Sequence, residues 1–368
     1  MSTADVWAAH LRPAVAGLPL RVRPATADWL NLKSNELLHP RVDELSAAYL
    51  RGCDAELVRR YPDQRALSTA LAAHHGVDPA EVMLTAGSDT AIGLLVQAVG
   101  AVTGRLVVVE PDYEAWTEHG ALHGVAVRPV AVGPEEAGSA VDLLLDALRA
   151  APPSLVALST PNGHSGQPVD VAELDRLAGE AADGGHVVVV DTCYHVFDPA
   201  STDLIARLRR HRNVVVVNSY SKAFGLAGAR LAAVVADPGV TSYLRHWRAD
   251  GAVSALATGL LAARLDEPAT MADIWADVAA WRRAAAADVE TGCPGWRCPD
   301  TAANFLTVDT GSKAAASAAV TALAGERIRV RHLGGGPQWR TRLRLTVAPP
   351  PVLARTVEIL SHTAALEV

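Results

Sequence analysis

One lysine of this chain stands where an amine would suit covalent chemistry with an aldehyde. Lys222 follows four valines at 214–217, serines flank it at 219 and 221, and Arg230 lies eight positions further on in a glycine-rich stretch. An amine at a strand end can form an imine with a carbonyl carbon, and nearby hydroxyl and guanidinium groups can hold a phosphate. A solvated lysine after a buried strand would explain the Ser-x-Ser-Lys part alone, but the whole run favours a site for a phosphorylated aldehyde.

The run 218–230 resembles the segment around the Schiff-base lysine in the class I and II aminotransferases, which are fold-type I enzymes that use pyridoxal phosphate (PLP). The resemblance implies that PLP is the cofactor and that Lys222 binds its carbonyl carbon. It implies that Ser219, Ser221 and Arg230 hold the cofactor phosphate. It also implies that Lys222 carries the proton between substrate and cofactor during amino transfer.

An aspartate ends another predicted strand of the same kind. Asp191 follows the valines at 187–190 and opens the sequence DTCY, which ends at Tyr194. PLP accepts electrons only while its ring nitrogen is protonated, and a buried carboxylate is the usual partner of that cation. The family has DEAY at this point, so the resemblance implies that Asp191 binds the ring nitrogen and that Tyr194 donates to the phenolic oxygen of the ring. A helix cap is the alternative role for an aspartate at a strand end.

A third segment predicts an anion site. Residues 85–90 read TAGSDT and lead from a predicted strand into a helix, so free backbone N–H groups and the positive end of the helix meet there. The family's GNGSDE is similar and binds the cofactor phosphate, which implies that role for Gly87, Ser88 and Asp89. Plain capping of the helix by Ser88 or Asp89 is compatible with it.

Three more matches complete the expected cofactor site. Tyr113 stands in the sequence PDY, like the aromatic residue that the family places flat on the PLP ring. Asn162 in PNGHSG partly matches a family loop whose asparagine donates to the phenolic oxygen, although such a sequence is also an ordinary turn. Tyr61 in RYPD matches a tyrosine that reaches the cofactor phosphate of a neighbouring subunit, which implies a homodimer. The alternative for Tyr61 is an amphipathic anchor before a proline.

The C-terminal part carries candidate substrate residues. Residues 342–347 read RLRLTV and resemble a family strand whose arginine holds the substrate carboxylate. A guanidinium fork suits that task, and the match assigns it to Arg344. Arg342 and Arg340 alternate onto the same face if the strand extends that far, and they are second choices. Arg331 matches an arginine that often meets the distal end of the substrate.

The resemblance covers about residues 31–347 and is closest to the histidinol-phosphate aminotransferase group. That group carries NENPYGP near its N-terminus, where residues 34–40 of this chain read SNELLHP. Leu38 replaces the tyrosine that contacts the substrate phosphate, and a leucine cannot donate a hydrogen bond. Asn35 and Leu38 are expected on the substrate side of the site, and histidinol phosphate is expected to be a poor substrate. Glu36 would suit a cationic side chain, or is a surface glutamate.

Alternating strand and helix patterns around these motifs predict an α/β fold with a mostly parallel sheet. Short strands rich in Val and Leu, the composition of strands buried on both faces, are predicted at 82–85, 106–110, 155–159, 187–191, 214–218 and 231–235. Covering helices are predicted at 67–75, 91–100, 171–182 and 203–210. Beyond Tyr243 the patterns predict helices at 271–289 and 313–323 and strands at 304–309, 328–331 and 343–347.

The chain has 368 residues, more than one compact core usually holds, so two domains are predicted. Residues 41–245 are expected to form the large PLP-binding domain, and residues 1–40 and 246–368 the small domain. Together they would make the fold-type I arrangement, in which helices flank the mostly parallel central sheet of the large domain. The small α/β domain would be built from the N- and C-terminal segments.

The composition is that of an ordinary enzyme and argues against several other classes. The net charge of −7 and the pI near 6.0 disfavour nucleic acid or an anionic membrane as the main partner. No apolar run approaches the roughly 18 residues of a membrane span, and the segment 1–5 lacks the basic and apolar regions of an export signal. The four cysteines are too few and scattered for a disulfide framework, and Cys293 and Cys298 have no further zinc ligands nearby. A cytoplasmic protein without a metal is expected.

The sequence leaves two classes of function. The first is an enzyme, an aminotransferase that acts on an α-amino acid and a 2-oxo acid in the biosynthesis of amino acids or specialised metabolites. A histidinol-phosphate aminotransferase, or a PLP-dependent decarboxylase or lyase on the same scaffold, is the alternative within this class. The second class is a PLP-binding sensor or scaffold. Such proteins usually carry a fused DNA-binding domain, and the chain shows no N-terminal extension large enough for one.

Overall fold

The protein is built around a large sheet whose strands are almost all parallel. The computed structural model describes residues 28–134, 136, 139–334 and 336–366, together with residues 15, 17, 18 and 20. Seven strands lie in the order β2-β8-β7-β6-β5-β3-β4, and only β8 runs antiparallel to its neighbours. The predicted mostly parallel sheet is confirmed. The strands are β2 (Val82–Thr85), β3 (Arg105–Glu110), β4 (Ala126–Ala131), β5 (Leu155–Ser159), β6 (Val187–Asp191), β7 (Val214–Ser219) and β8 (Ala232–Val235).

Both faces of this sheet are buried, which explains the Val-rich strands. Val107 and Val109 of β3 belong to one hydrophobic core, and Leu106 and Val108 belong to a second core. The alternation follows from the period of two in a strand, which sends successive side chains to opposite faces. Each such side chain contributes about 1.5–3 kcal/mol when fully buried. The edge strand β4 is largely exposed and contains a proline, so no hydrophobic pattern predicted it.

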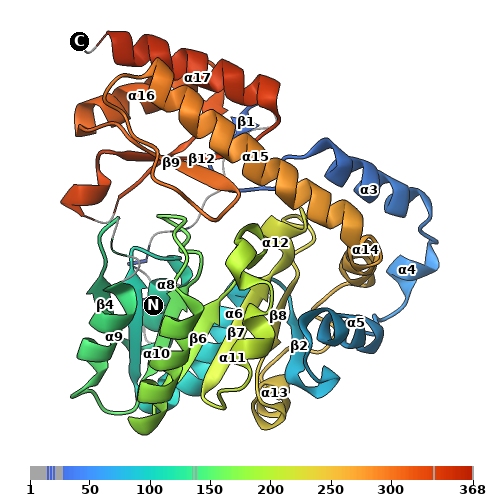
Figure 1. Ribbon diagram of the computed structural model, residues 1–368. Helices are drawn as coiled ribbons and strands as arrows, with labels where there is room; N and C mark the ends of the chain where they lie inside the picture. The colour runs from blue at the N-terminus through green and yellow to red at the C-terminus, as the bar shows by residue number, and fades with distance from the viewer. Residues whose placement is uncertain are drawn as a thin grey trace, which may run out of the picture.

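Helices cover the two faces of the large sheet (Figure 1). They are α5 (Arg65–His75), α6 (Ser88–Leu95), α8 (Ala115–His123), α9 (Ala140–Leu148), α10 (Val171–Asp183), α11 (Leu204–Leu208) and α13 (Pro238–Arg245). The short helix α12 (Tyr220–Ala223) follows the end of β7 at the upper edge of the sheet. The helix predicted at 91–100 begins earlier, at Ser88, and continues after α6 as a π-helical segment, η2 (Val96–Gly100).

A smaller α/β unit lies beyond the carboxyl ends of the parallel strands, at the top of Figure 1. Its antiparallel sheet has the order β11-β12-β9, with β11 (Arg331–His332), β12 (Arg342–Thr346) and β9 (Phe305–Asp309). Helices α15 (Pro268–Gly292), α16 (Lys313–Gly325) and α17 (Pro350–Ala365) pack together beside it. The prediction of a single strand at 328–331 is wrong. The strand is interrupted at Val330, which separates β10 (Ile328–Arg329) from β11, because the two halves pair with different strands.

The described N-terminal segment packs against this smaller unit. Strand β1 (Leu30–Asn31) pairs in parallel with β10. The Thr346 N–H donates to the Leu32 carbonyl, and the Asn35 N–H donates to the Thr346 hydroxyl at 2.9 Å. The chain then continues through α3 (Pro40–Arg51) and α4 (Glu56–Arg59), which project to the side in Figure 1, and α14 (Ala255–Leu265) packs against both.

Three further findings apply to the described ranges. No helix there combines the length and the apolar character that a bilayer crossing requires. No cluster of three or more His, Cys, Asp or Glu side chains is arranged there to hold a metal ion. All four cysteines are free thiols.

Candidate active site

A cavity of about 490 Å³ lies between the large sheet and the smaller unit. It stands where the carboxyl ends of the parallel strands meet, the usual ligand position in an open α/β sheet, and its size suits a small molecule. Strand β8 is antiparallel, so its start lies at the same edge. Loops after five of the parallel strands, the loop before β8 and residues 33–36 converge there.

Twelve of the sixteen residues predicted from the sequence line this cavity. They are Asn35, Ser88, Asp89, Tyr113, Asp191, Tyr194, Ser219, Ser221, Lys222, Arg230, Arg331 and Arg344. The other four, Leu38, Tyr61, Gly87 and Asn162, do not line it. The twelve come from segments far apart in the chain, and the parallel sheet brings them together.

Lys222 extends into the cavity from the short helix α12. Ser219 caps that helix, because its hydroxyl accepts a hydrogen bond from the Ser221 N–H. The Lys222 ammonium donates to the backbone carbonyl of Ser34 at 2.5 Å. The amine thus lies between the strand ends and the N-terminal segment, where it can meet a bound carbonyl carbon.

Asp191 is a buried carboxylate without a cation. The residue is 3% exposed, and its carboxylate accepts hydrogen bonds from Cys193, from the N–H at 3.0 Å and from the thiol. Within the described residues no lysine, arginine or histidine forms a salt bridge with it. Burial, and to a smaller extent the nearby charge of Asp112, raise the pKa of Asp191 to about 7. A protonated ring nitrogen would supply the missing partner, because an unpaired buried charge is costly. On this observation the site fits PLP.

Asp112 is a second buried carboxylate at the site, and the sequence motifs assigned it no role. It accepts hydrogen bonds from the Ser159 N–H and hydroxyl and from the Tyr113 N–H, at 2.8, 2.5 and 2.6 Å. Burial raises its pKa to about 6, against the lowering effect of these hydrogen bonds. The carboxylate ties the ends of β3 and β5 together and positions Tyr113. The available signal was an aspartate just after a buried strand.

The expected phosphate end of the cavity is built around Arg230. Gly87 has φ +88°, and a Cβ there would lie 2.6 Å from Nη2 of Arg230, so glycine allows this close approach. No side chain caps the start of α6, which leaves N–H groups of its first turn for an anion. Arg230 forms an ion pair with Asp89 at 3.4 Å, and Asp89 also accepts a hydrogen bond from the Tyr113 hydroxyl at 2.5 Å. Gly87 thus shapes the site without lining the cavity.

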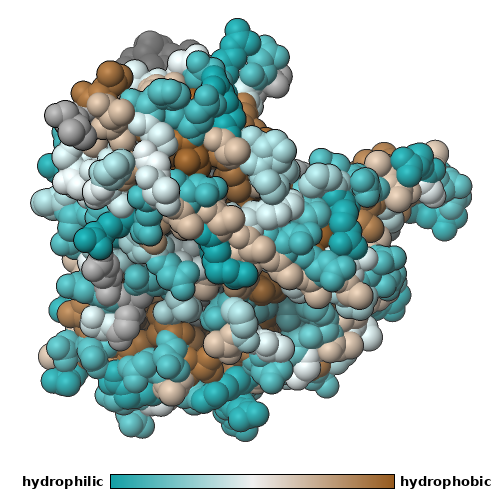
Figure 2. Space-filling model, turned by 45° about the horizontal axis from the view of Figure 1, so that its top comes forward, coloured by the Kyte–Doolittle hydropathy of each residue, from teal (hydrophilic) through white to brown (hydrophobic). Residues whose placement is uncertain are grey.

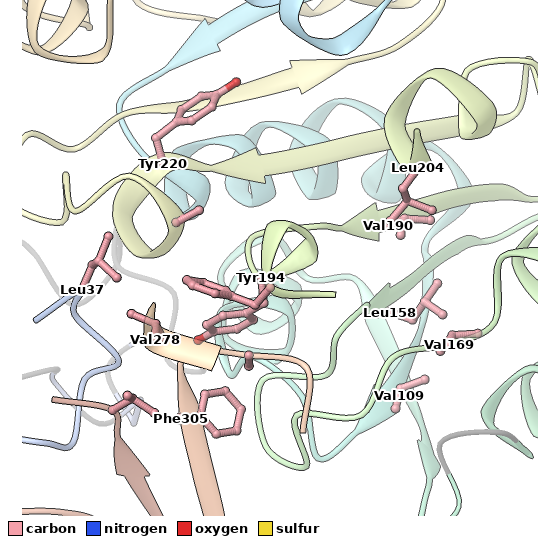
Figure 3. Packing of buried hydrophobic residues seen from close by; sticks show 14 of the residues in the cluster. Leu37, Val109, Leu158, Val169, Val190, Tyr194, Leu204, Tyr220, Val278 and Phe305 are labelled. Carbon is pink, nitrogen blue, oxygen red and sulfur yellow. The ribbon is translucent and has the colours of Figure 1, made fainter. Parts of the chain in front are cut away.

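Tyr194 stands between the core of the large sheet and the smaller unit (Figure 3). Its ring packs edge to face against Phe305 of β9, with ring centroids 5.4 Å apart. The Asn35 amide donates to its hydroxyl at 2.8 Å, which leaves the hydroxyl proton for another acceptor. Burial raises the pKa of Tyr194 above its usual range. The neutral hydroxyl is therefore a donor in the cavity.

Arg344 reaches the cavity from β12 and is 7% exposed. Its guanidinium donates to the backbone carbonyls of Gly163 and, at 3.1 Å, Lys33, and it lies 5.2 Å from the ring centroid of Phe305. Its buried Nε has no hydrogen-bond partner in the part of the chain that the structure describes. Burial lowers its pKa to about 10, so it stays charged at neutral pH. An orphaned donor on a buried cation suits a carboxylate ligand.

The two second-choice arginines do not line the cavity. Arg342 forms an ion pair with Asp309 at 2.9 Å, and Arg340 precedes the first residue of β12. Alternation along the strand does place Arg342 on the face of Arg344, but its guanidinium is engaged by the neighbouring strand β9.

Besides Gly87, three predicted residues lie outside the cavity surface. The Asn162 amide donates to the Pro111 carbonyl at 3.1 Å, and its oxygen accepts backbone N–H groups of its own loop. Asn162 thus shapes a turn, and its donation to the phenolic oxygen of the cofactor stays a prediction. Leu38 is half-buried and packs against the hydrophobic core. Tyr61 is 97% exposed.

Several charged residues at the mouth of the cavity were not predicted from the sequence. Lys33, Glu114 and Glu118 line it together with Arg331, and Arg331 forms an ion pair with Glu114. Glu114 precedes α8 and Arg331 lies on β11, so the pair joins the large-sheet side to the smaller unit. No local pattern marks such a pair, because its members are 217 positions apart.

Comparison with known proteins agrees with this geometry. Residues 27–360 match the family "Aminotransferase class I and II". A histidinol-phosphate aminotransferase of Stenotrophomonas maltophilia is 32% identical over 82% of this chain and 84% of its own. An aromatic amino acid aminotransferase of Mycobacterium bovis is 29% identical over 93% of this chain and 95% of its own.

Among solved structures, a histidinol-phosphate aminotransferase of Sinorhizobium meliloti in complex with PLP has the same fold. It superposes with a TM-score of 0.83 at 24% identity, over 97% of this chain and 98% of that one. The fold-type I architecture predicted from the sequence is thereby confirmed. The chain belongs to the class I and II aminotransferase family and is a PLP-dependent aminotransferase.

Proposed function

We propose that this aminotransferase takes the amino group from an α-amino acid with a free carboxylate and gives it to a 2-oxo acid. The observation that supports the proposal is Arg344, a buried cation with an unpaired Nε that lines the same cavity as Lys222 and Asp191 in the described part of the chain. A guanidinium fork binds a carboxylate through two parallel hydrogen bonds. Histidinol phosphate carries no carboxylate, so its phosphate would have to take the place of the carboxylate on this arginine.

Several groups of residues would hold the cofactor, which supplies an electron sink for the substrate carbon. Asp191 would hold the protonated ring nitrogen, and Tyr194 would donate to the phenolic oxygen. Tyr113 would lie against the ring, held by Asp112. The phosphate would meet donors at the strand ends, namely the N–H groups of Ser88 and Asp89 beside Gly87, the hydroxyls of Ser88, Ser219 and Ser221, and the guanidinium of Arg230.

Lys222 would be the proton carrier of the reaction. Its ammonium donates to the Ser34 carbonyl, which orients the amine in the cavity. Arg344 would fix the substrate carboxylate so that the Cα–H bond faces Lys222. The neutral amine of Lys222 would then take the proton from Cα and give it up on the cofactor side. This orientation separates amino transfer from decarboxylation, in which the carboxylate would occupy the position of the proton.

We also propose that the active unit is a homodimer in the cytoplasm. Tyr61 and Val58 are 97% and 86% exposed, and Leu50 in α3 is 50% exposed. The segment that carries them projects from the body of the molecule, with apolar surface among its polar atoms (Figure 2). A projecting arm with exposed apolar side chains suits contact with a second subunit, where Tyr61 would meet the partner's cofactor phosphate.

The domain division is part of the same proposal. Residues 41–245 would form the large domain, and residues 1–40 and 246–368 the small one. The hydrogen bonds between the segment 32–35 and β12 support the assignment of the N-terminal residues to the small domain. Residues 1–14 and 21–27 lie outside the described ranges.

A comparison of specificity constants tests the substrate proposal. We expect kcat/KM to be higher for at least one free α-amino acid than for histidinol phosphate. Leu38 cannot donate the hydrogen bond that a tyrosine at this position would give to the substrate phosphate. The loss of a hydrogen bond to a charged group lowers specificity by roughly ten- to a hundredfold. Arg331 acts in the other direction, since it is placed to meet a distal phosphate. If histidinol phosphate exceeds every amino acid tested, Leu38 is tolerated and the enzyme is a histidinol-phosphate aminotransferase.

A further inference from the structure

Two arginines stand side by side on the small sheet and face the same cavity. Arg331 of β11 and Arg344 of β12 are direct cross-strand partners, and both line the cavity. Side chains at directly opposite positions of an antiparallel pair lie on one face, with Cβ atoms about 4.5–5.5 Å apart. The charge of Arg331 contributes to the lowered pKa of Arg344. Two adjacent cations would by themselves attract a substrate with two anionic groups.

Glu114 alters this balance from the opposite wall. It precedes α8 on the large-sheet side and forms an ion pair with Arg331 across the cavity mouth. The side chains of Arg331 and Glu114 are 28% and 46% exposed, so the pair contributes little to stability. Its main effect is on the charge that a ligand meets. A second anion must displace Glu114 before Arg331 becomes available to it.

The remaining charges of the mouth act in the same direction. Apart from Arg344 and the charged residues assigned to the cofactor, the lining carries two cations, Lys33 and Arg331, against three glutamates at 36, 114 and 118. The formal charge of these five residues is −1. A distal anion therefore meets net negative charge, whereas a neutral or cationic side chain does not. Lys33 belongs to the same cluster, because Arg331, Glu114 and Arg344 all influence its pKa.

We infer that Glu114 is a specificity-determining residue: it neutralises Arg331 and directs the enzyme toward amino acids without a second anionic group. The inference rests on the proposed function in one respect, namely that the substrate carboxylate binds Arg344. The favoured substrate class is α-amino acids with an uncharged or cationic side chain. Glu114 lies on the opposite wall from both arginines, so the choice of side chain depends on both walls of the cavity.

The test compares two isosteric donors, glutamine and glutamate, in the PLP-loaded enzyme. We expect the wild type to prefer glutamine. Glu114→Gln keeps the side-chain shape, frees Arg331, and should move the kcat/KM ratio toward glutamate by roughly ten- to a hundredfold, mainly through KM. An unchanged ratio would overturn the inference. Glu114→Ala is the second variant if the glutamine substitution disturbs folding.

Two controls show whether Glu114 acts through Arg331. In the double variant Glu114→Gln/Arg331→Gln the gain for glutamate should disappear, since the arginine that binds the second anion is absent. A double variant that keeps the gain would contradict the inference. Glu118→Gln removes the same charge one helical turn further along the chain and should produce a smaller shift in the kcat/KM ratio toward glutamate. Equal shifts in Glu114→Gln and Glu118→Gln would also contradict it, because they would indicate a general charge effect.

A binding measurement separates this inference from the proposed function. Glutarate carries two carboxylates, its monoamide glutaramate carries one, and neither has an amino group to transfer. Calorimetric titration of the PLP-loaded protein should give a higher affinity for glutaramate in the wild type, and a shift toward glutarate in Glu114→Gln. If no amino acid is turned over, the proposed function fails, while this affinity ratio still supports or overturns the role of Glu114.

Discussion

Replacing Asp191 with asparagine should stabilise the PLP-free protein and disable the enzyme. The substitution is nearly isosteric. It retains the side-chain oxygen that accepts the Cys193 N–H at 3.0 Å, and it removes the ionisable group. Asp191 is 3% exposed and has no cationic partner among the described residues, so its charge is a cost to the folded PLP-free protein.

The size and pH dependence of that cost follow from the pKa of Asp191. The ordinary pKa of the carboxyl is 3.8, and burial raises it to about 7 in the folded protein. A shift of about three units corresponds to about 4 kcal/mol. Because the folded pKa is raised, the wild type has no penalty below pH 3.8, loses stability as the pH rises toward 7, and carries the full penalty above it.

Denaturant titration of the PLP-free proteins measures this difference. The side chain in the Asp191→Asn variant is neutral at every pH, so the variant should have the higher free energy of unfolding. Its advantage should grow by about 2–3 kcal/mol from about pH 5 to about pH 8, since part of the penalty already exists at the lower pH. Asp112, whose pKa is also raised, is present in both proteins, so its contribution largely cancels in the difference between their free energies of unfolding. An advantage that is equal at both pH values would refute the reasoning.

The same variant should behave in the opposite way once PLP is bound. The protonated ring nitrogen would offset the charge of Asp191, so PLP should stabilise the wild type more than the variant. Turnover of the variant should fall by several orders of magnitude while PLP remains bound, because the phosphate contacts are untouched. If turnover falls by less than tenfold, Asp191 is a capping residue and the partner of the ring nitrogen lies elsewhere.

The remaining predictions concern the amine, the phosphate end and the assembly. Borohydride should fix PLP covalently on Lys222, as mass spectrometry of the peptides would show. Lys33→Ala should keep this adduct and Lys222→Ala should lose it. An adduct that survives in Lys222→Ala would exclude the assignment of Lys222. Gly87→Ala should weaken PLP binding about tenfold or more, because its Cβ would lie 2.6 Å from Arg230, whereas Gly179→Ala, with no neighbour within 4 Å, should not. Tyr61→Phe should weaken PLP retention, and sedimentation should show at least twice the chain mass; an active monomer at assay concentration would contradict this.

The sequence by itself determined six of the seven strands of the large sheet, the cofactor and twelve of the residues that line the cavity. The runs of valine at 187–190 and 214–217 are long, β-branched and buried on both faces, so local pattern and final burial agree. Asp191 and Lys222 stand at or just after the ends of such strands. In a parallel sheet the residues that follow the strands meet at one edge, so their position in the sequence already implied their position in the site.

Only the tertiary structure decided which charges face each other at the mouth of the cavity. The ion pair of Glu114 and Arg331 joins residues 217 positions apart on different walls, and no spacing rule predicts it. The direction of the Asn162 amide was also beyond local pattern, because its hydrogen bonds depend on where Pro111 lies in a neighbouring loop. The types of residue near the strand ends predicted the chemistry, whereas the distances between loops that never adjoin in sequence decide which charges a ligand meets in the cavity.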